Sequence, residues 1–233
     1  MKEYIILAGG FGTRLQSVVK DIPKCMAPVA GKPFLYYLLK YAESQKAEHI
    51  ILSLGYRSDI IIEWLRNNKF NLKISYTIEE EPLGTGGAIK YAFGKVEGTK
   101  ALIINGDTFF KVRAQELEAF HTSMNGDITI ALKPMQSFDR YGSVDLNAES
   151  CIIKFNEKQF CDKGLINGGV YLINKDIFNK LELPHKFSFE TDILEKKLKD
   201  LSIYGYIQDD YFIDIGIPSD YEKANKDFQN NPF

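Results

Sequence analysis

The sequence predicts an α/β protein in which a mixed, mainly parallel central sheet lies between two layers of helices. Apolar runs of strand length alternate with amphipathic segments through the first half of the chain, and this alternation is typical of a parallel sheet covered on both faces. The second half has more strand-like runs and fewer helical ones, which predicts an extension of the same sheet that is antiparallel or mixed. No repeat and no Pro/Gly-rich linker divides the 233 residues, so we expect a single domain.

The first half supplies the parallel part of the expected sheet. Its strand-like runs are residues 4–7, 49–54, 73–78 and 100–105. Its helical segments are residues 33–44, 59–68 and 85–93. Pro33 suits the first turn of its helix, where the missing N–H has no intrahelical partner. In a sheet of this kind, ligands bind outside the carboxyl ends of the strands.

The second half supplies the remaining strands. Its strand-like runs are residues 127–133, 142–146, 151–155 and 168–173, and its helical segments are residues 188–198 and 219–228.

The composition is that of a globular enzyme. The 29 basic and 31 acidic residues almost cancel, which argues against a nucleic-acid-binding protein with a basic face. No apolar run approaches the ~20 residues that a membrane helix needs, and the N-terminus enters a strand without a secretory signal. The three cysteines have no metal or disulfide spacing, so we expect reduced thiols and a cytoplasmic protein. The sequence leaves the oligomeric state open, a homodimer included.

A glycine-rich turn directly follows the first expected strand. Gly9, Gly10 and Gly12 allow the backbone to approach a ligand closely and to direct N–H groups at it. Arg14 and Lys24 add two cations that suit phosphate oxygens. The spacing fits neither a P-loop nor a dinucleotide fingerprint. We therefore interpret this segment as a cradle for a polyphosphate.

Two carboxylates follow apolar runs elsewhere in the chain. Asp107 comes after residues 101–104 and beside Gly106, and Asp214 ends another hydrophobic run and precedes Gly216. Carboxylates together with phosphates are the ligands that Mg²⁺ usually takes in proteins. The alternative is a plain Asx turn, which needs no ligand.

The residues of the glycine-rich segment and Lys24 resemble the signature of the sugar-1-phosphate nucleotidyltransferases, and the resemblance extends over nearly the whole chain. It implies a Rossmann-like three-layer sandwich with a nucleotide-binding half, residues 1–125, and a sugar-binding half, residues 126–233. These enzymes join a nucleoside triphosphate to a sugar 1-phosphate and release pyrophosphate. Lys24 would then be catalytic with Arg14 and Asp107, and Mg²⁺ would bind Asp107 and Asp214.

The resemblance also implies which residues contact each substrate. The nucleotide would contact Leu7, Ala8, Gly9, Gly10, Gly12, Thr13, Arg14, Glu81, Gly84, Thr85 and Gly106. The sugar phosphate would contact Gly142, Glu157, Lys158, Asn167 and Gly168. Each sugar segment alone is also explained by a turn or by solvated surface charge. Glu79 and Glu80 are expected to be a solvated strand end.

Within the family, residues 21–35, 81–88 and 166–172 look most like the guanylyltransferases that act on D-glycero-α-D-manno-heptose 1-phosphate. This implies GTP as donor and a role in surface-glycan synthesis. Mannose 1-phosphate with GTP, or glucose 1-phosphate with another triphosphate, are alternatives. A silent sugar-nucleotide-binding subunit is a further one, although retention of Arg14, Lys24, Asp107 and Asp214 favours an active enzyme.

Cys25 stands where the family often has proline. A thiol beside Lys24 could have a depressed pKa, but a tolerated substitution is the simpler interpretation.

Overall fold

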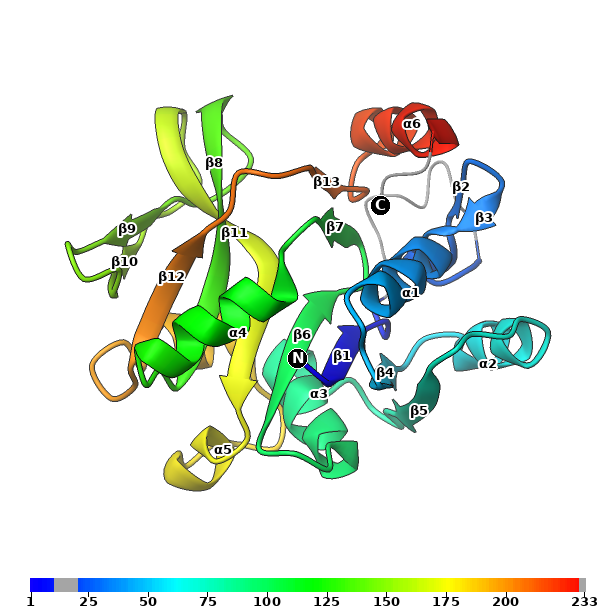
Figure 1. Cartoon of the computed structure of the whole chain (residues 1–233), viewed down its shortest axis with the longest axis horizontal. Coiled ribbons are helices and arrows are strands. Elements are labelled where there is room, and N and C mark those ends of the chain that lie inside the picture. The colour runs from blue at the N-terminus through cyan, green and yellow to red at the C-terminus, as the bar shows by residue number, and fades with distance from the viewer. Residues whose placement is uncertain (11–20, 231–233) are drawn as a thin grey trace.

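The computed structural model describes residues 1–10 and 21–230 and contains a seven-stranded sheet (Figure 1). The strand order is β12-β8-β11-β6-β1-β4-β5. Four of the six pairings are parallel, and β11 pairs antiparallel with both β6 and β8. The strands are β1 (Glu3–Leu7), β4 (His49–Leu54), β5 (Lys73–Ile78), β6 (Lys100–Asn105), β8 (Ile128–Phe138), β11 (Cys161–Asn174) and β12 (Ile203–Ile207). The expected mixed, mainly parallel sheet is confirmed.

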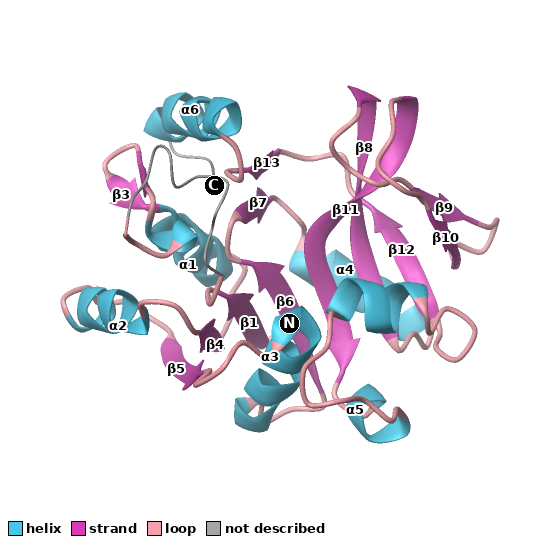
Figure 2. Cartoon of the chain, turned by 180° about the vertical axis from the view of Figure 1, so that it is seen from behind, coloured by secondary structure: helices cyan, strands magenta, loops and turns pink. Residues whose placement is uncertain are grey.

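Helices cover both faces of this sheet, as Figures 1 and 2 show from opposite sides. One face packs against α1 (Phe34–Ser44), α2 (Ser58–Arg66), α4 (Ala114–Ser123) and α6 (Pro218–Asp227). The other packs against α3 (Gly84–Ala92), α5 (Ile177–Lys180) and the π-helix η4 (Phe189–Glu195). Successive side chains of a strand point to opposite faces of the sheet, so each strand contributes to both cores. In β1, Tyr4 and Ile6 face the first core and Ile5 faces the second.

Several elements differ from the sequence-based expectation. Pro33 is the residue that precedes α1 rather than part of its first turn. The helix expected at residues 188–198 is the shorter η4, followed by turns. β8 and β11 extend well beyond the predicted runs and rise past the other strands in Figure 1, because each is the long partner of the other. Two further elements, α4 and β12, were not predicted from the sequence.

Three two-stranded ribbons complete the described chain. β2 (Pro28–Val29) pairs with β3 (Lys32–Pro33), and β9 (Val144–Leu146) pairs with β10 (Ile152–Phe155). β7 (Thr108–Phe110) pairs antiparallel with β13 (Phe212–Asp214), which joins two segments far apart in the sequence. None of the helices formed by residues 1–10 and 21–230 has the length and apolar character required to cross a membrane.

Candidate active site

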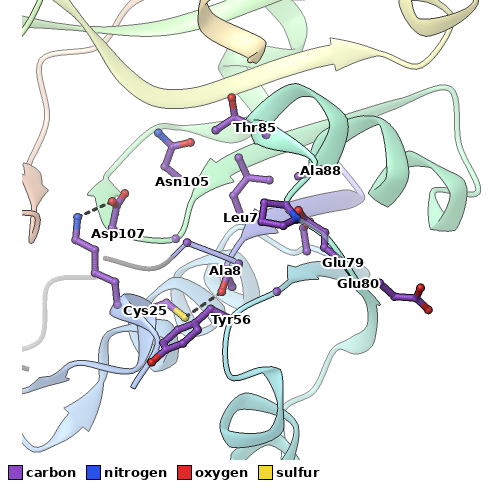
Figure 3. A pocket seen from close by; sticks show the side chains of 18 residues that line it. Leu7, Ala8, Cys25, Tyr56, Glu79, Glu80, Thr85, Ala88, Asn105 and Asp107 are labelled. Atoms are coloured by element: carbon purple, nitrogen blue, oxygen red, sulfur yellow. Dashed lines mark hydrogen bonds and ion pairs between the residues drawn. The ribbon is translucent and has the colours of Figure 1, made fainter. Parts of the chain in front are cut away.

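A cavity of about 600 Å³ opens at the carboxyl ends of β1, β4 and β6 (Figure 3). This is where a sheet of this topology binds its ligands. The lining combines a glycine-bearing turn after β1, the turn after β4, the segment from β5 into α3 and the turn after β6. The lining residues that the sequence analysis assigned are Leu7, Ala8, Gly9, Gly10, Lys24, Gly84, Thr85, Gly106 and Asp107. Gly12, Thr13 and Arg14 lie outside the described residues.

Gly9 is held against the turn that follows β4. A Cβ atom on Gly9 would lie 3.1 Å from the backbone nitrogen of Gly55, and a Cβ on Gly55 would lie 3.1 Å from the Gly9 oxygen. Tyr56 N–H donates to the Gly9 oxygen at 3.3 Å. The two turns therefore approach backbone to backbone, which fixes one wall of the cavity.

The opposite wall is the amino-terminal end of α3. Gly84 adopts φ +73°, and a Cβ there would lie 2.4 Å from the Phe187 oxygen, so only glycine fits without distortion. The Gly86 N–H donates to the same oxygen at 3.0 Å, and the Phe187 N–H donates to the Leu83 oxygen at 3.0 Å. Thr85 accepts a hydrogen bond from the Phe189 N–H at 2.9 Å. Residues 187–189 of the second half thus fasten the first turn of α3.

Glu79 rather than Glu81 faces the cavity. Glu79 is half-buried, lines the cavity and accepts a hydrogen bond from the Leu83 N–H at 2.9 Å, whereas Glu81 is exposed and is not among the lining residues. The interpretation of Glu79 as part of a solvated strand end was wrong, because the chain turns inward before Leu83. Glu80 is exposed, although it also lies on the rim of the cavity.

Burial raises the pKa of the Glu79 carboxyl, with the hydrogen bond from Leu83 opposing the shift. A raised folded-state pKa means that the folded protein binds more protons than the unfolded chain just above pH 4.5, so Glu79 lowers stability as pH rises through that range. We expect Glu79→Gln to gain stability relative to the wild type as pH increases from 4 to 7. Urea unfolding at several pH values measures this difference, and a constant difference would contradict it.

Asp107 and Asp214 converge because of strand pairing. In the β7–β13 ribbon Asp214 lies opposite Thr108. The Ile215 N–H donates to the backbone carbonyl oxygen of Asp107 at 3.0 Å. Lys24, at the start of the 3-10 helix η2 (Lys24–Met26), points between the two carboxylates. Its Nζ lies 2.6 Å from Asp107 Oδ2 and 3.7 Å from Asp214 Oδ1.

This pair of carboxylates fits a divalent cation. Lys24 Nζ lies within 4 Å of an oxygen of each, so the two carboxylates face a common position. Among residues 1–10 and 21–230 there is no cluster of three or more Asp, Glu, His or Cys side chains suited to an ion. Mg²⁺ commonly binds one or two carboxylates and completes its coordination with waters and substrate phosphates. Asp107 also lines the cavity, where such phosphates would lie.

Cys25 is buried in the wall of the cavity. Desolvation raises the pKa of its thiol to about 12, and the charge of Asp107 adds to the shift. The suggestion that Lys24 lowers this pKa was therefore wrong, and a packed, tolerated substitution explains Cys25 better.

The three sugar segments come together around Ser143. The Asn156 N–H donates to the Ser143 oxygen at 2.8 Å, and Ser143 forms an isolated antiparallel bridge with Ile166. Gly142 therefore lies close to the segment that carries Glu157 and Lys158, both exposed.

Two of the predicted sugar residues on β11 have contacts within the protein. Asn167 donates to the Tyr171 hydroxyl at 3.0 Å, and a Cβ on Gly168 would lie 2.4 Å from the Phe110 ring. Close packing against Phe110 therefore explains the glycine at position 168 without a bound sugar. The sugar segments do not line the 600 Å³ cavity, although the Gly169 backbone lies beside Asn105, which does.

Nine lining residues were not selected from the sequence as site residues: Cys25, Ser53, Gly55, Tyr56, Glu79, Glu80, Pro82, Ala88 and Asn105. Gly55 directly follows an apolar strand, as Gly9 and Gly106 nearly do, so the same signal would have found it. Glu79 could not be found in this way, because its orientation depends on the turn before α3.

The fold and this cavity define a nucleotide-dependent transferase. The chain belongs to the nucleotidyl transferase family, whose profile matches residues 3–231. It is 50% identical to a D-glycero-alpha-D-manno-heptose 1-phosphate guanylyltransferase of Aneurinibacillus thermoaerophilus, over 98% of this chain and 99% of that protein. It is 48% identical to a protein of the same name from Campylobacter jejuni, over 93% and 96%. The crystal structure of HddC from Yersinia pseudotuberculosis complexed with GMP-PN superposes with a TM-score of 0.88 at 42% identity, over 98% of this chain and 100% of HddC.

Proposed function

We propose that this protein is a guanylyltransferase that joins GTP and D-glycero-α-D-manno-heptose 1-phosphate into GDP-heptose and releases pyrophosphate. The observation that carries the proposal is the 50% identity to the Aneurinibacillus protein of that name across nearly the full length of both chains. The cavity supports it, because a glycine-walled space beside a lysine and two carboxylates suits a triphosphate.

The proposed reaction is an in-line displacement at the α-phosphorus of GTP. An oxygen of the heptose 1-phosphate forms a bond to that phosphorus, and the bond from phosphorus to the oxygen that bridges the α- and β-phosphates breaks. Pyrophosphate leaves with the bond electrons. The attacking oxygen is already anionic, so the protein needs no general base, and its task is to position the phosphates and neutralise their charge.

On the nucleotide side, the backbone at Gly9 and Gly10 would lie along the triphosphate, together with Gly12 and Thr13. Arg14 would hold the leaving pyrophosphate, and Lys24 would stabilise charge at the α-phosphate. The base would lie near the amino-terminal end of α3. We assign the carboxylate that faces the base to Glu79 in place of Glu81, because Glu79 lines the cavity and guanine presents N–H donors that a carboxylate accepts.

Asp107 and Asp214 would hold Mg²⁺, and the family generally uses a divalent metal. When bound, the ion would supply positive charge that offsets the charge of the substrate phosphates. The protein's own contribution is to fix the two carboxylates through the β7–β13 pairing.

On the sugar side, Lys158 would bind the phosphate of the sugar 1-phosphate, and Glu157 would accept hydrogen bonds from sugar hydroxyls. The backbone at Gly142 and the Asn167 side chain would complete this site, with Gly168 leaving room on β11. This division assigns residues 1–125 to the nucleotide and 126–233 to the sugar. The product would supply surface-glycan synthesis such as that of a capsule, lipopolysaccharide or S-layer.

The three cysteines are free thiols, which supports a cytoplasmic location, where thiols stay reduced.

Release of pyrophosphate tests the proposal. The purified protein is incubated with Mg²⁺, GTP and either D-glycero-α-D-manno-heptose 1-phosphate or α-D-mannose 1-phosphate. We expect kcat/KM with the heptose to exceed that with mannose by at least about tenfold, the low end of what one extra carbon confers in a fitted pocket. Release with mannose alone would move the protein to the mannose 1-phosphate branch. Absence of release with both sugars and all four triphosphates would favour the silent sugar-nucleotide-binding subunit.

A further inference from the structure

The strongest feature beyond the proposed reaction is the position of the Lys24 ammonium group. Its side chain is only 10% exposed, and Nζ lies 2.6 Å from Asp107 Oδ2 and 3.7 Å from Asp214 Oδ1. Asp107 and Asp214 are the two carboxylates that would hold the divalent cation. Lys24 therefore already neutralises part of the charge of the proposed metal site.

The space that the ammonium occupies is formed by a glycine. A Cβ on Gly216 would lie 2.9 Å from Lys24 Nζ and 2.8 Å from Asp214 Oδ1. The Gly216 N–H also donates to Asp214 Oδ1 at 2.7 Å, which fixes the carboxylate oxygen nearest the lysine. The chain therefore provides a fitted place for the ammonium between the two acids.

We propose that Lys24 is the built-in counter-ion of Asp107 and Asp214 in the free protein, and that it must leave them when a divalent cation binds. A metal ion that took Asp107 Oδ2 and Asp214 Oδ1 as ligands would compete with the ammonium group for the same oxygens, because like charges held this close together repel each other in a partly buried site. The released ammonium would then be free to contact the α-phosphate. This inference rests on the proposed function, since it takes the metal site from it.

Two consequences separate this role from a purely catalytic one. First, Lys24 keeps two neighbouring carboxylates together before any substrate is present, so the site is organised in advance. Second, Lys24 competes with the metal, so metal binding in the absence of nucleotide is weaker than the two carboxylates alone would allow. Phosphates bring their own negative charge and offer the ammonium new partners, which favours metal binding once the triphosphate has entered.

The test is a titration with Mn²⁺ alone, in which electron paramagnetic resonance measures the free ion and no nucleotide or sugar phosphate is present. Mn²⁺ prefers oxygen ligands, as Mg²⁺ does. We expect Lys24→Gln to bind Mn²⁺ about five- to tenfold more tightly than the wild type, the low end of typical coupling between two bound groups. Lys24→Arg retains the charge and is expected to bind no more tightly than the wild type. Lys90→Gln removes the same charge from an exposed residue in the last turn of α3 that does not line the cavity, and it is expected to leave the affinity unchanged.

Unchanged or weaker Mn²⁺ binding by Lys24→Gln would overturn the inference, and so would equal tightening by Lys90→Gln, which would indicate a general charge effect. The melting temperature of each variant without metal shows that it is folded. Because no substrate is present, this titration stands apart from the pyrophosphate assay. If no pyrophosphate is released but Lys24→Gln binds Mn²⁺ more tightly than the wild type, only the proposed substrates are refuted. If pyrophosphate is released but Lys24→Gln binds Mn²⁺ as the wild type does, only the competition between Lys24 and the metal is refuted.

Discussion

Replacement of Asp107 by Asn is expected to lower kcat by at least about 100-fold while leaving the protein folded, since loss of one group that organises transition-state charge costs this much or more. Asp107 lines the cavity, and its Oδ2 lies 2.6 Å from Lys24 Nζ. Asn preserves the shape of the side chain but removes the charge that a divalent cation and an ammonium group require. The measurement is the initial rate of pyrophosphate release at saturating substrates, with circular dichroism to establish the fold.

The matched control for this change is Asp176→Asn. Asp176 precedes α5 and pairs with Lys180 at the surface. It follows Asn174, which pairs with Lys100 at the start of β6, whereas the cavity lies at the other end of that strand. An exposed pair of this kind contributes at most about 1 kcal/mol, so turnover should be unaffected. If Asp107→Asn kept turnover close to that of the control, the assignment of Asp107 to the metal and to catalysis would be wrong.

The parallel half of the fold could be predicted because its signals are local. The runs at residues 49–54, 73–78 and 100–105 coincide with β4, β5 and β6, since each is rich in apolar or β-branched residues and lies between turns. The positions of Lys24, Gly84 and Asp107 at the cavity follow from the same logic. Strands that run in parallel end at one edge of the sheet, so the turns after them meet there.

The elements that escaped prediction depend on contacts distant in sequence. β12 contains Gly205, which weakens a strand pattern, yet a Cβ there would lie 2.4 Å from Leu132, so the glycine serves the packing of neighbouring strands. The first part of β11, from Cys161, is partly exposed and gains its structure from antiparallel pairing with β8. The helix α4 buries only Ala114, Leu117 and His121 and has a weak amphipathic pattern.

The site shows the same division. Asp107 and Asp214 could each be selected from an apolar run that ends in an acid, but their convergence follows from the register of β7 and β13. Sequence also gives no sign that Lys24 lies between them, because this arrangement needs the space left by Gly216. The orientation of Glu79 toward the cavity likewise depends on its hydrogen bond from Leu83.

Gly106→Ala is expected to destabilise the protein by about 3 kcal/mol, near the upper end of what an added methylene costs in a packed site. A Cβ on Gly106 would lie 2.2 Å from the Leu7 oxygen and 3.1 Å from the Leu7 carbonyl carbon, and these are backbone atoms of the central strand. The Gly106 N–H also donates to the Leu7 oxygen at 3.0 Å. The turn after β6 must therefore move away from β1, and Asp107 moves with it.

This displacement links stability to activity. A shift of about 1 Å in a catalytic group can cost about 100-fold in rate, so Gly106→Ala should lose turnover even in the fraction that remains folded. Gly94→Ala is the matched control, because no atom lies within 4 Å of a Cβ at that position and its backbone does not require glycine. We expect this control to be neutral or slightly stabilising, by up to about 1 kcal/mol. Urea unfolding and pyrophosphate release on both variants test the link. A Gly106→Ala protein with wild-type stability and turnover would show that the contact between the turns after β1 and β6 does not position Asp107.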